Sequence, residues 1–143
     1  MFHPNVRGAA VPPGTPSGTL FVSVSQTWQA NNPVVPQNVS LEDCARGYWW
    51  IRNLQAAWYT QCEYLMAHRD GVIVGAWRID LVKGWMQPMQ TPKATWPTDC
   101  HQHPTPSRKR GCELIADEEL NRFVGQPVCM GTCPNPLRGY FIP

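Results

Sequence analysis

Residues 45–80 decide the fold of this chain, and they read ARGYWWIRNLQAAWYTQCEYLMAHRDGVIVGAWRID. They predict a short aromatic strand at 47–52, an amphipathic helix, a tight turn at Asp70-Gly71 and a β-branched strand over 72–81. Four of the seven tryptophans of the chain lie inside this stretch. So many large aromatic rings in one unit indicate a dense core, an aromatic pocket, or both.

The helix of this stretch is expected to begin at an Asn53 cap and to run to about His68. Its buried face would be a stripe of residues at helical spacing. The stripe consists of Leu54, Ala57, Trp58, Cys62, Leu65 and Met66. The strand after the turn is apolar on both faces, so we expect a central strand that is covered on each side.

Upstream of this stretch, residues 1–18 are rich in Pro, Gly and Ala and have no periodicity, which predicts a disordered or extended segment. Residues 19–25 (TLFVSVS) alternate between apolar and polar positions and predict a half-buried strand. Ser40 with Asp43 resembles a capping box, which indicates a short helix near 40–45.

Downstream, five prolines within 83–107 predict a long, stiffened loop, and loops of this length are often functional. The pattern then predicts a strand over 108–115 and a short helix over 117–123. The first turn of that helix is acidic, as the helix dipole favours. A final strand is predicted over 137–142.

The composition fits one domain, which we expect to span residues 19–143. The chain has 143 residues, of which 43% are hydrophobic and 15% charged. About five strands, one main helix and short helices predict an α+β fold. The sheet is expected to be small, mixed, and curved or barrel-like.

No segment reaches the roughly 18 apolar residues that span a bilayer. The first residues also lack the apolar core of a secretory signal. We therefore expect a cytoplasmic protein with reduced thiols and no membrane partner. The formal net charge of +2 does not by itself imply nucleic acid.

A set of aromatic and basic residues could form a ligand pocket, because aromatic rings stack on bases and guanidinium groups contact phosphates. The set consists of Trp49, Trp50, Trp77 and Trp85 with Arg46, Arg52 and Arg78. Successive strand residues alternate, so one of Trp49 and Trp50 can be core while the other faces a cavity. The alternative is simple core packing, which we expect for Trp58 and which also fits Trp77.

Further phosphate contacts could come from the run Arg108-Lys109-Arg110 and from Arg138. Three adjacent cations are equally typical of a solvated loop.

Cys and His residues near the C-terminus have spacings that zinc could use. Cys100, His103, Cys129 and Cys133 would complete a four-ligand site. No CxxC pair is present, however, and we expect unpaired thiols, loop histidines and no cofactor.

The catalytic templates fail. The triplet at 68–70 (HRD) mimics a kinase loop, but the phosphate-binding and metal-binding motifs of that family are missing. We therefore expect a protein that is not an enzyme.

Two motifs together resemble a known family. The first is ARGYWWI, a helix, GVIVGAWRI and then Trp85; the second is the tail FVGQPV at 123–128, followed by Gly131 and NPLRGY at 135–140. They resemble the PUA-like barrel group, which includes the ASCH and EVE domains. The chain is most similar to an uncharacterised bacterial and phage domain of that type.

This resemblance implies a domain that binds DNA or RNA and seats a modified or flipped base in a pocket between strands. It leaves a second hypothesis open, a small phage-type factor that binds and inhibits a host protein in the host cytoplasm. Exposed Trp and Tyr residues also form protein-binding hot spots, so they serve either hypothesis.

Overall fold

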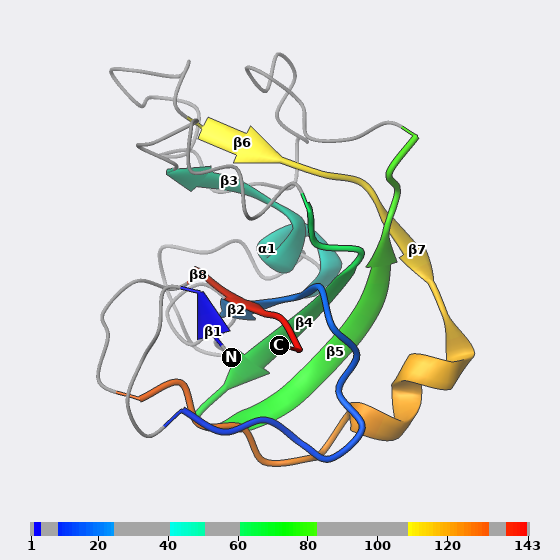
Figure 1. Ribbon diagram of the computed structural model, residues 1–143. Helices are drawn as coiled ribbons and strands as arrows, with labels where there is room; N and C mark the ends of the chain where they lie inside the picture. The colour runs from blue at the N-terminus through cyan, green and yellow to red at the C-terminus, as the bar shows by residue number, and fades with distance from the viewer. Residues whose placement is uncertain are drawn as a thin grey trace.

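The structure is a computed structural model that describes residues 2–3, 9–24, 41–50, 61–82, 109–131 and 137–142. Its strands are β1 (Phe2–His3), β2 (Thr19–Ser23), β3 (Gly47–Trp50), β4 (Tyr64–Arg69), β5 (Val72–Ile79), β6 (Lys109–Gly111), β7 (Leu114–Ala116) and β8 (Leu137–Tyr140). Its helices are α1 (Leu41–Arg46) and the 3-10 helix η3 (Glu118–Phe123), as Figure 1 shows. For 2–3, 43–44, 46–50 and 109–111 only the backbone is described.

Six strands form one mixed sheet in the order β1-β8-β2-β4-β5-β7, and β3 pairs with β6 in a separate ladder. Strands β2 and β4 run parallel, while the other pairings of the described strands are antiparallel. The outer strands β1 and β7 do not pair with each other, so the sheet is open in the described part of the chain. The α+β class and the mixed sheet are as predicted.

The predicted turn at Asp70-Gly71 is confirmed. Arg69 pairs with Val72, so only two residues connect β4 to β5. Asp70 has φ of 53° and Gly71 has φ of 79°. Two successive residues with positive φ are typical of the type I′ turn, whose twist matches that of an antiparallel hairpin.

The predicted helix is wrong over its last third, because residues 64–69 form strand β4. Leu65 and Ala67 point into one core cluster and Met66 into another, which is the alternation of a strand. A short apolar run buried on both sides fits either a strand or a helix. The hairpin turn that follows requires a strand on its upstream side and decides the outcome. Residues 53–60 lie outside the described residues.

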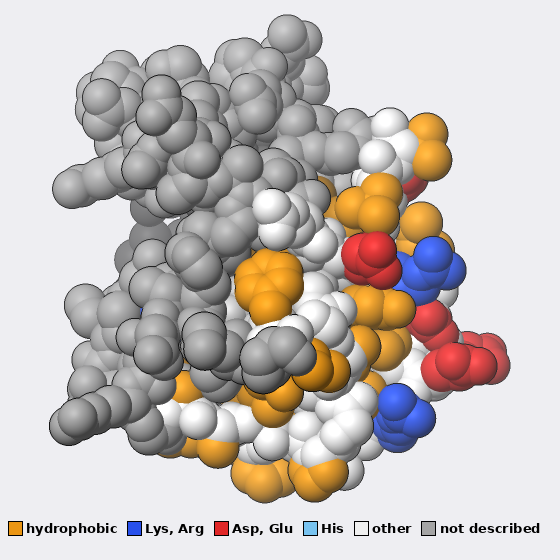
Figure 2. Space-filling model, viewed as in Figure 1, with side chains coloured by type: hydrophobic (Ala, Val, Ile, Leu, Met, Phe, Trp, Pro, Cys, Tyr) orange, Lys and Arg blue, Asp and Glu red, His pale blue; other side chains and the backbone are white. Residues whose placement is uncertain are grey.

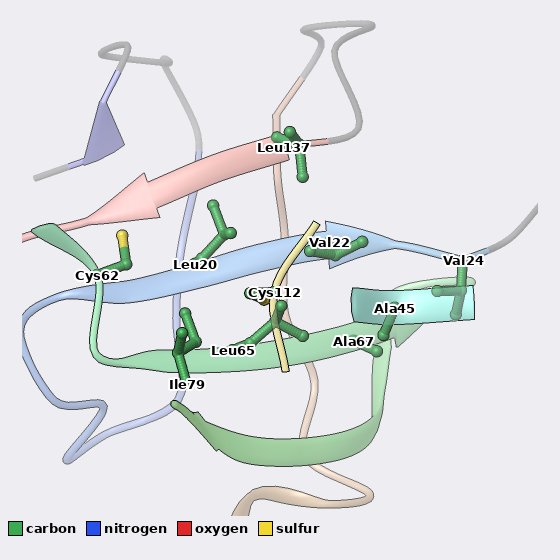
Figure 3. Close-up of a cluster of buried hydrophobic side chains, with 10 residues drawn as sticks. All are labelled: Leu20, Val22, Val24, Ala45, Cys62, Leu65, Ala67, Ile79, Cys112 and Leu137. Atoms are coloured by element: carbon green, nitrogen blue, oxygen red, sulfur yellow. The ribbon is translucent and has the colours of Figure 1, made fainter. Parts of the chain in front are cut away.

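The sheet is covered on both faces, which we name by the helices that pack there. The α1 face, drawn in Figure 3, carries a cluster of Leu20, Val22, Val24, Ala45, Cys62, Leu65, Ala67, Ile79, Cys112 and Leu137. The η3 face carries Phe21, Met66, Ile73, Ala76, Leu120, Phe123 and Val128. Strand β2 is therefore buried on both sides, and the expectation that it is half-buried is wrong.

A β-bulge in β5 shifts the alternation of its side chains. Ala67 pairs with Gly75 while His68 pairs with Ile73, so Val74 is the additional residue. Val74 consequently packs toward the α1 face, and Ile73 toward the η3 face. Without this bulge, one half of β5 would direct its apolar residues to the wrong face.

The segment expected to form one strand at 108–115 is divided between two ladders. Strand β6 pairs with β3, and β7 pairs with β5. Between them Cys112 is buried in the α1-face cluster. The short helix that follows is confirmed as η3, which Asp117 caps by accepting a 3.0 Å hydrogen bond from the backbone N–H of Glu119.

In the N-terminal segment, expected to be disordered or extended, residues 9–18 lie against the sheet and contain a turn at Pro13-Gly14. Ala10 and Cys129 exchange two backbone hydrogen bonds of 2.8 and 2.9 Å. The N–H of Gly18 donates to the carbonyl of Tyr140 over 2.8 Å. Within the described ranges, no helix is long and apolar enough to cross a membrane.

Gly75→Ala is expected to lower the free energy of unfolding by about 1–3 kcal/mol, because the added methyl group would overlap the indole of Trp77. Urea unfolding measures this loss. In a Trp77→Phe background the same substitution should cost less, because the overlapping ring atoms are removed. An equal loss in both backgrounds would show that the contact does not matter.

Candidate nucleic-acid interface

The ladder of β3 and β6 brings aromatic and basic residues of the chain into register. Trp49 pairs with Arg110, and Trp50 pairs with Lys109. The register shifts between Gly47 and Trp49, so a β-bulge precedes the two tryptophan positions. Cβ atoms of directly opposite residues in an antiparallel ladder lie about 4.5–5.5 Å apart. Two tryptophans and two cations that are about 60 positions apart in the sequence therefore share one small ladder.

The core anchors this ladder at the end where Gly47 pairs with Gly111. Helix α1 leads directly into β3, and Ala45 of α1 is fully buried in the α1-face cluster. Strand β6 leads into Cys112, which is fully buried in the same cluster. Figure 1 shows β3 and β6 side by side beyond α1, on the side of that helix away from the main sheet. The ladder thus lies on the α1 side of the main sheet, beyond that helix.

Trp77 and Arg78 do not converge on one site, because they are neighbours in β5 and point to opposite faces. Trp77 is partly buried, packs against the α1-face cluster and lies over Gly75. Arg78 is exposed and pairs with Tyr64, which packs against the η3-face cluster. Trp77 therefore contributes to the core, and Arg78 belongs to the other side of the sheet.

Arg138 is not part of a surface with Lys109 and Arg110. It pairs with Phe21 on the η3 face and is only 1% exposed. The ladder of β3 and β6 is attached to the α1 face, so the main sheet separates the two. The interpretation of Arg138 as a surface phosphate contact in the tail does not fit this placement.

Several candidates cannot be placed. Arg52, Trp85, Cys100, His103, Arg108 and Cys133 lie outside the described residues. Arg46 is described by its backbone alone, at the end of α1. Of the four zinc candidates only Cys129 is described; it is an exposed free thiol. Among the described side chains no group of three or more His, Cys, Asp or Glu could hold a metal ion.

The surface around η3 has a different character from the ladder. Glu118 and Glu119 are exposed in its first turn, and Arg122 is exposed near its end, over the ring of Phe123. Figure 2 shows acidic and basic side chains intermixed on this side of the molecule. Mixed charges do not attract a polyanion, so η3 is a suitable place for control substitutions.

Two buried titratable groups were not singled out by the sequence. Burial raises the pKa of the Cys62 thiol to about 12, so this sulfur stays protonated and is no nucleophile. Burial lowers the pKa of His68 to about 4, so its ring is neutral near pH 7. His68 pairs with Ser23 and Ile73, which places it on the η3 face. The triplet at 68–70 is thus the end of a strand and a turn, rather than the helix end and turn that the sequence predicts.

The chain has no match among protein-family models, curated proteins or solved structures.

Stability is expected to decrease as the pH falls from 6.5 to 4. The folded-state pKa of His68, about 4, lies below the ordinary value of 6.5, so the unfolded chain binds this proton more readily. The contribution of neutral His68 to the free energy of unfolding is fully present above pH 6.5 and is lost as the pH falls toward 4. The total loss is about 3 kcal/mol. Urea unfolding at several pH values measures the loss, and His68→Gln should remove it. If His68→Gln showed an unchanged profile, another group would be responsible.

Proposed function

We propose that this protein is a non-enzymatic module that binds nucleic acid or a modified base, and that the ladder of β3 and β6 is its contact surface. The observation that carries the proposal is the register that sets Trp49 opposite Arg110 and Trp50 opposite Lys109. Nucleic acid alternates between flat bases and charged phosphates. Each pair sets one ring beside one cation, and successive pairs point to opposite faces of the ladder, so one face offers one ring for a base and one cation for a phosphate.

The energies of the two contacts favour single-stranded nucleic acid. Stacking of one base on an aromatic side chain contributes about 1–3 kcal/mol, and it is available only where bases are unpaired. Lys and Arg add phosphate contacts that hold the strand without reading its sequence. A short ladder that projects from the core can meet an extended strand along its length.

The proposal includes the finer description of the fold as a PUA-like, barrel-like sheet. The segment 109–116 pairs with β3 through β6 and with β5 through β7. Only Cys112 and Glu113 lie between β6 and β7, so one short segment joins the two separate ladders, which supports a curved sheet. In PUA-like domains the base is bound between strands, and Trp49 and Trp50 lie on a strand in a suitable position.

The test is a fluorescence-anisotropy titration with a labelled single-stranded oligonucleotide at several salt concentrations. Trp49→Ala and Trp50→Ala each remove a candidate stacking platform, and at least one of them should weaken binding roughly 5-fold to 150-fold. At least one of Lys109→Gln and Arg110→Gln, namely the cation that pairs with the stacking tryptophan, should reduce the slope of log affinity against log salt by about 0.7.

Arg122→Gln is the matched control, because it removes a similar exposed charge from η3 rather than from the ladder. It should leave the affinity and the salt slope nearly unchanged. Absence of binding at low salt would contradict the proposal, and so would a salt slope that neither Lys109→Gln nor Arg110→Gln changes more than Arg122→Gln does. A pulldown that retains one protein after nuclease treatment would instead support the alternative of a protein partner.

A further inference from the structure

Arg138 is the most unusual residue in the described core. It lies on β8, opposite Phe21, and the row continues through Met66 to Ala76 across the η3 face. These three neighbours are apolar and buried. The Arg138 side chain is only 1% exposed, although it carries a guanidinium group. Buried guanidinium groups require compensation by an acceptor of opposite charge.

One nitrogen of this guanidinium has an acceptor. Nη1 donates a hydrogen bond of 2.6 Å to the carbonyl of the adjacent Leu137. This bond holds the guanidinium against its own strand. It satisfies only part of the donor capacity of the group, since a guanidinium has five N–H bonds.

The two other nitrogens, Nε and Nη2, are buried and have no hydrogen-bond partner. Their N–H bonds leave the same side of the planar group in parallel, as a fork with fixed spacing. This fork matches the two oxygens of a carboxylate or phosphate, which accept both hydrogen bonds together. The unpartnered atoms are thus a matched pair rather than two unrelated donors.

The described part of the chain supplies no counter-charge. All ten acidic residues except Asp43 and Asp99 have described side chains, and none of those described accepts from Nε or Nη2. Asp43 belongs to α1, which covers the opposite face of the sheet. His68, on the same face as Arg138, is neutral near pH 7 and neither competes with nor compensates the guanidinium.

We propose that Arg138 anchors a buried oxyanion site, in which Nε and Nη2 bind two oxygens of a carboxylate or phosphate group. The site lies on the η3 face and is separate from the ladder of β3 and β6, so it goes beyond the proposed nucleic-acid contact. Because the guanidinium is closed off from solvent, the anion enters during folding or through a local opening of the cover. Exchange of the bound anion is therefore slow.

The test is thermal unfolding of the full chain in buffers of equal ionic strength that contain chloride, inorganic phosphate or acetate. A ligand that binds the folded state raises the Tm as its concentration increases. The wild-type Tm should rise by roughly 3–6 °C per tenfold increase in phosphate or acetate above the dissociation constant. A rise with phosphate alone identifies a phosphate site, and a rise with acetate alone identifies a carboxylate site.

Arg138→Met is the decisive variant, because it keeps a long buried side chain and removes the fork. Its Tm should not depend on which anion is present, and in chloride it should be no lower than that of the wild type. Arg138→Lys keeps the charge but loses the bidentate geometry, so its anion-dependent rise should be smaller. Phosphate also raises the Tm of any protein because it is excluded from the protein surface. This general effect is the same for all variants, so it cancels when the Tm increase of a variant is subtracted from that of the wild type.

Two results would overturn the proposal. One is a wild-type Tm that is the same in chloride, phosphate and acetate, a comparison that needs no folded variant. The other is a rise that is as large in Arg138→Met as in the wild type. If the wild type shows no anion dependence and Asp99→Asn lowers its Tm, the counter-charge is supplied within the chain. Neither result bears on oligonucleotide binding, so the two proposals can fail separately.

Discussion

The parallel pairing of β2 with β4 is the constraint on which the rest of the structure depends. Two antiparallel strands can be joined by a tight turn, but parallel strands need a connection that returns along the sheet. Here that connection spans residues 24–63 and includes α1 and β3. Ala45 of α1 packs into the α1-face cluster, so the connection supplies the cover of this face. The connection that this parallel pairing requires therefore supplies both part of the core and one strand of the ladder.

The opposite face is covered by chain segments from both ends. Helix η3 contributes Leu120 and Phe123, and the N-terminal segment contributes Ala9 and Val11. Backbone hydrogen bonds between Ala10 and Cys129 join these two contributions. The η3 face is therefore covered by segments from near both ends of the chain, and these segments pack on apolar residues of the central strands. This is the face that encloses both His68 and Arg138, each of which carries a polar group into an apolar layer.

The two faces therefore support different chemistry. On the α1 face, the strand that leaves the helix pairs with a basic strand, and the ladder that they form is anchored by buried Ala45 and Cys112. On the η3 face, the pairing of Arg138 with Phe21 forces a guanidinium into the core. A surface charge contributes little to stability, whereas a buried one demands a partner. Arg138 is consequently the residue of the described core whose side chain most clearly calls for a partner.

The sequence by itself determined the local elements whose signals depend on near neighbours. The Asp70-Gly71 turn, the apolar strand after it, the short helix at 41–46 and the capped η3 all rest on spacings of a few residues. It also identified Trp49, Trp50, Lys109 and Arg110 as candidates, but as two unrelated groups. Only the tertiary structure decided that they share a ladder, that residues 64–69 are a strand, and that Arg138 is buried. The physical reason is that these outcomes depend on pairing between distant strands, and local periodicity carries no information about which strand lies beside which.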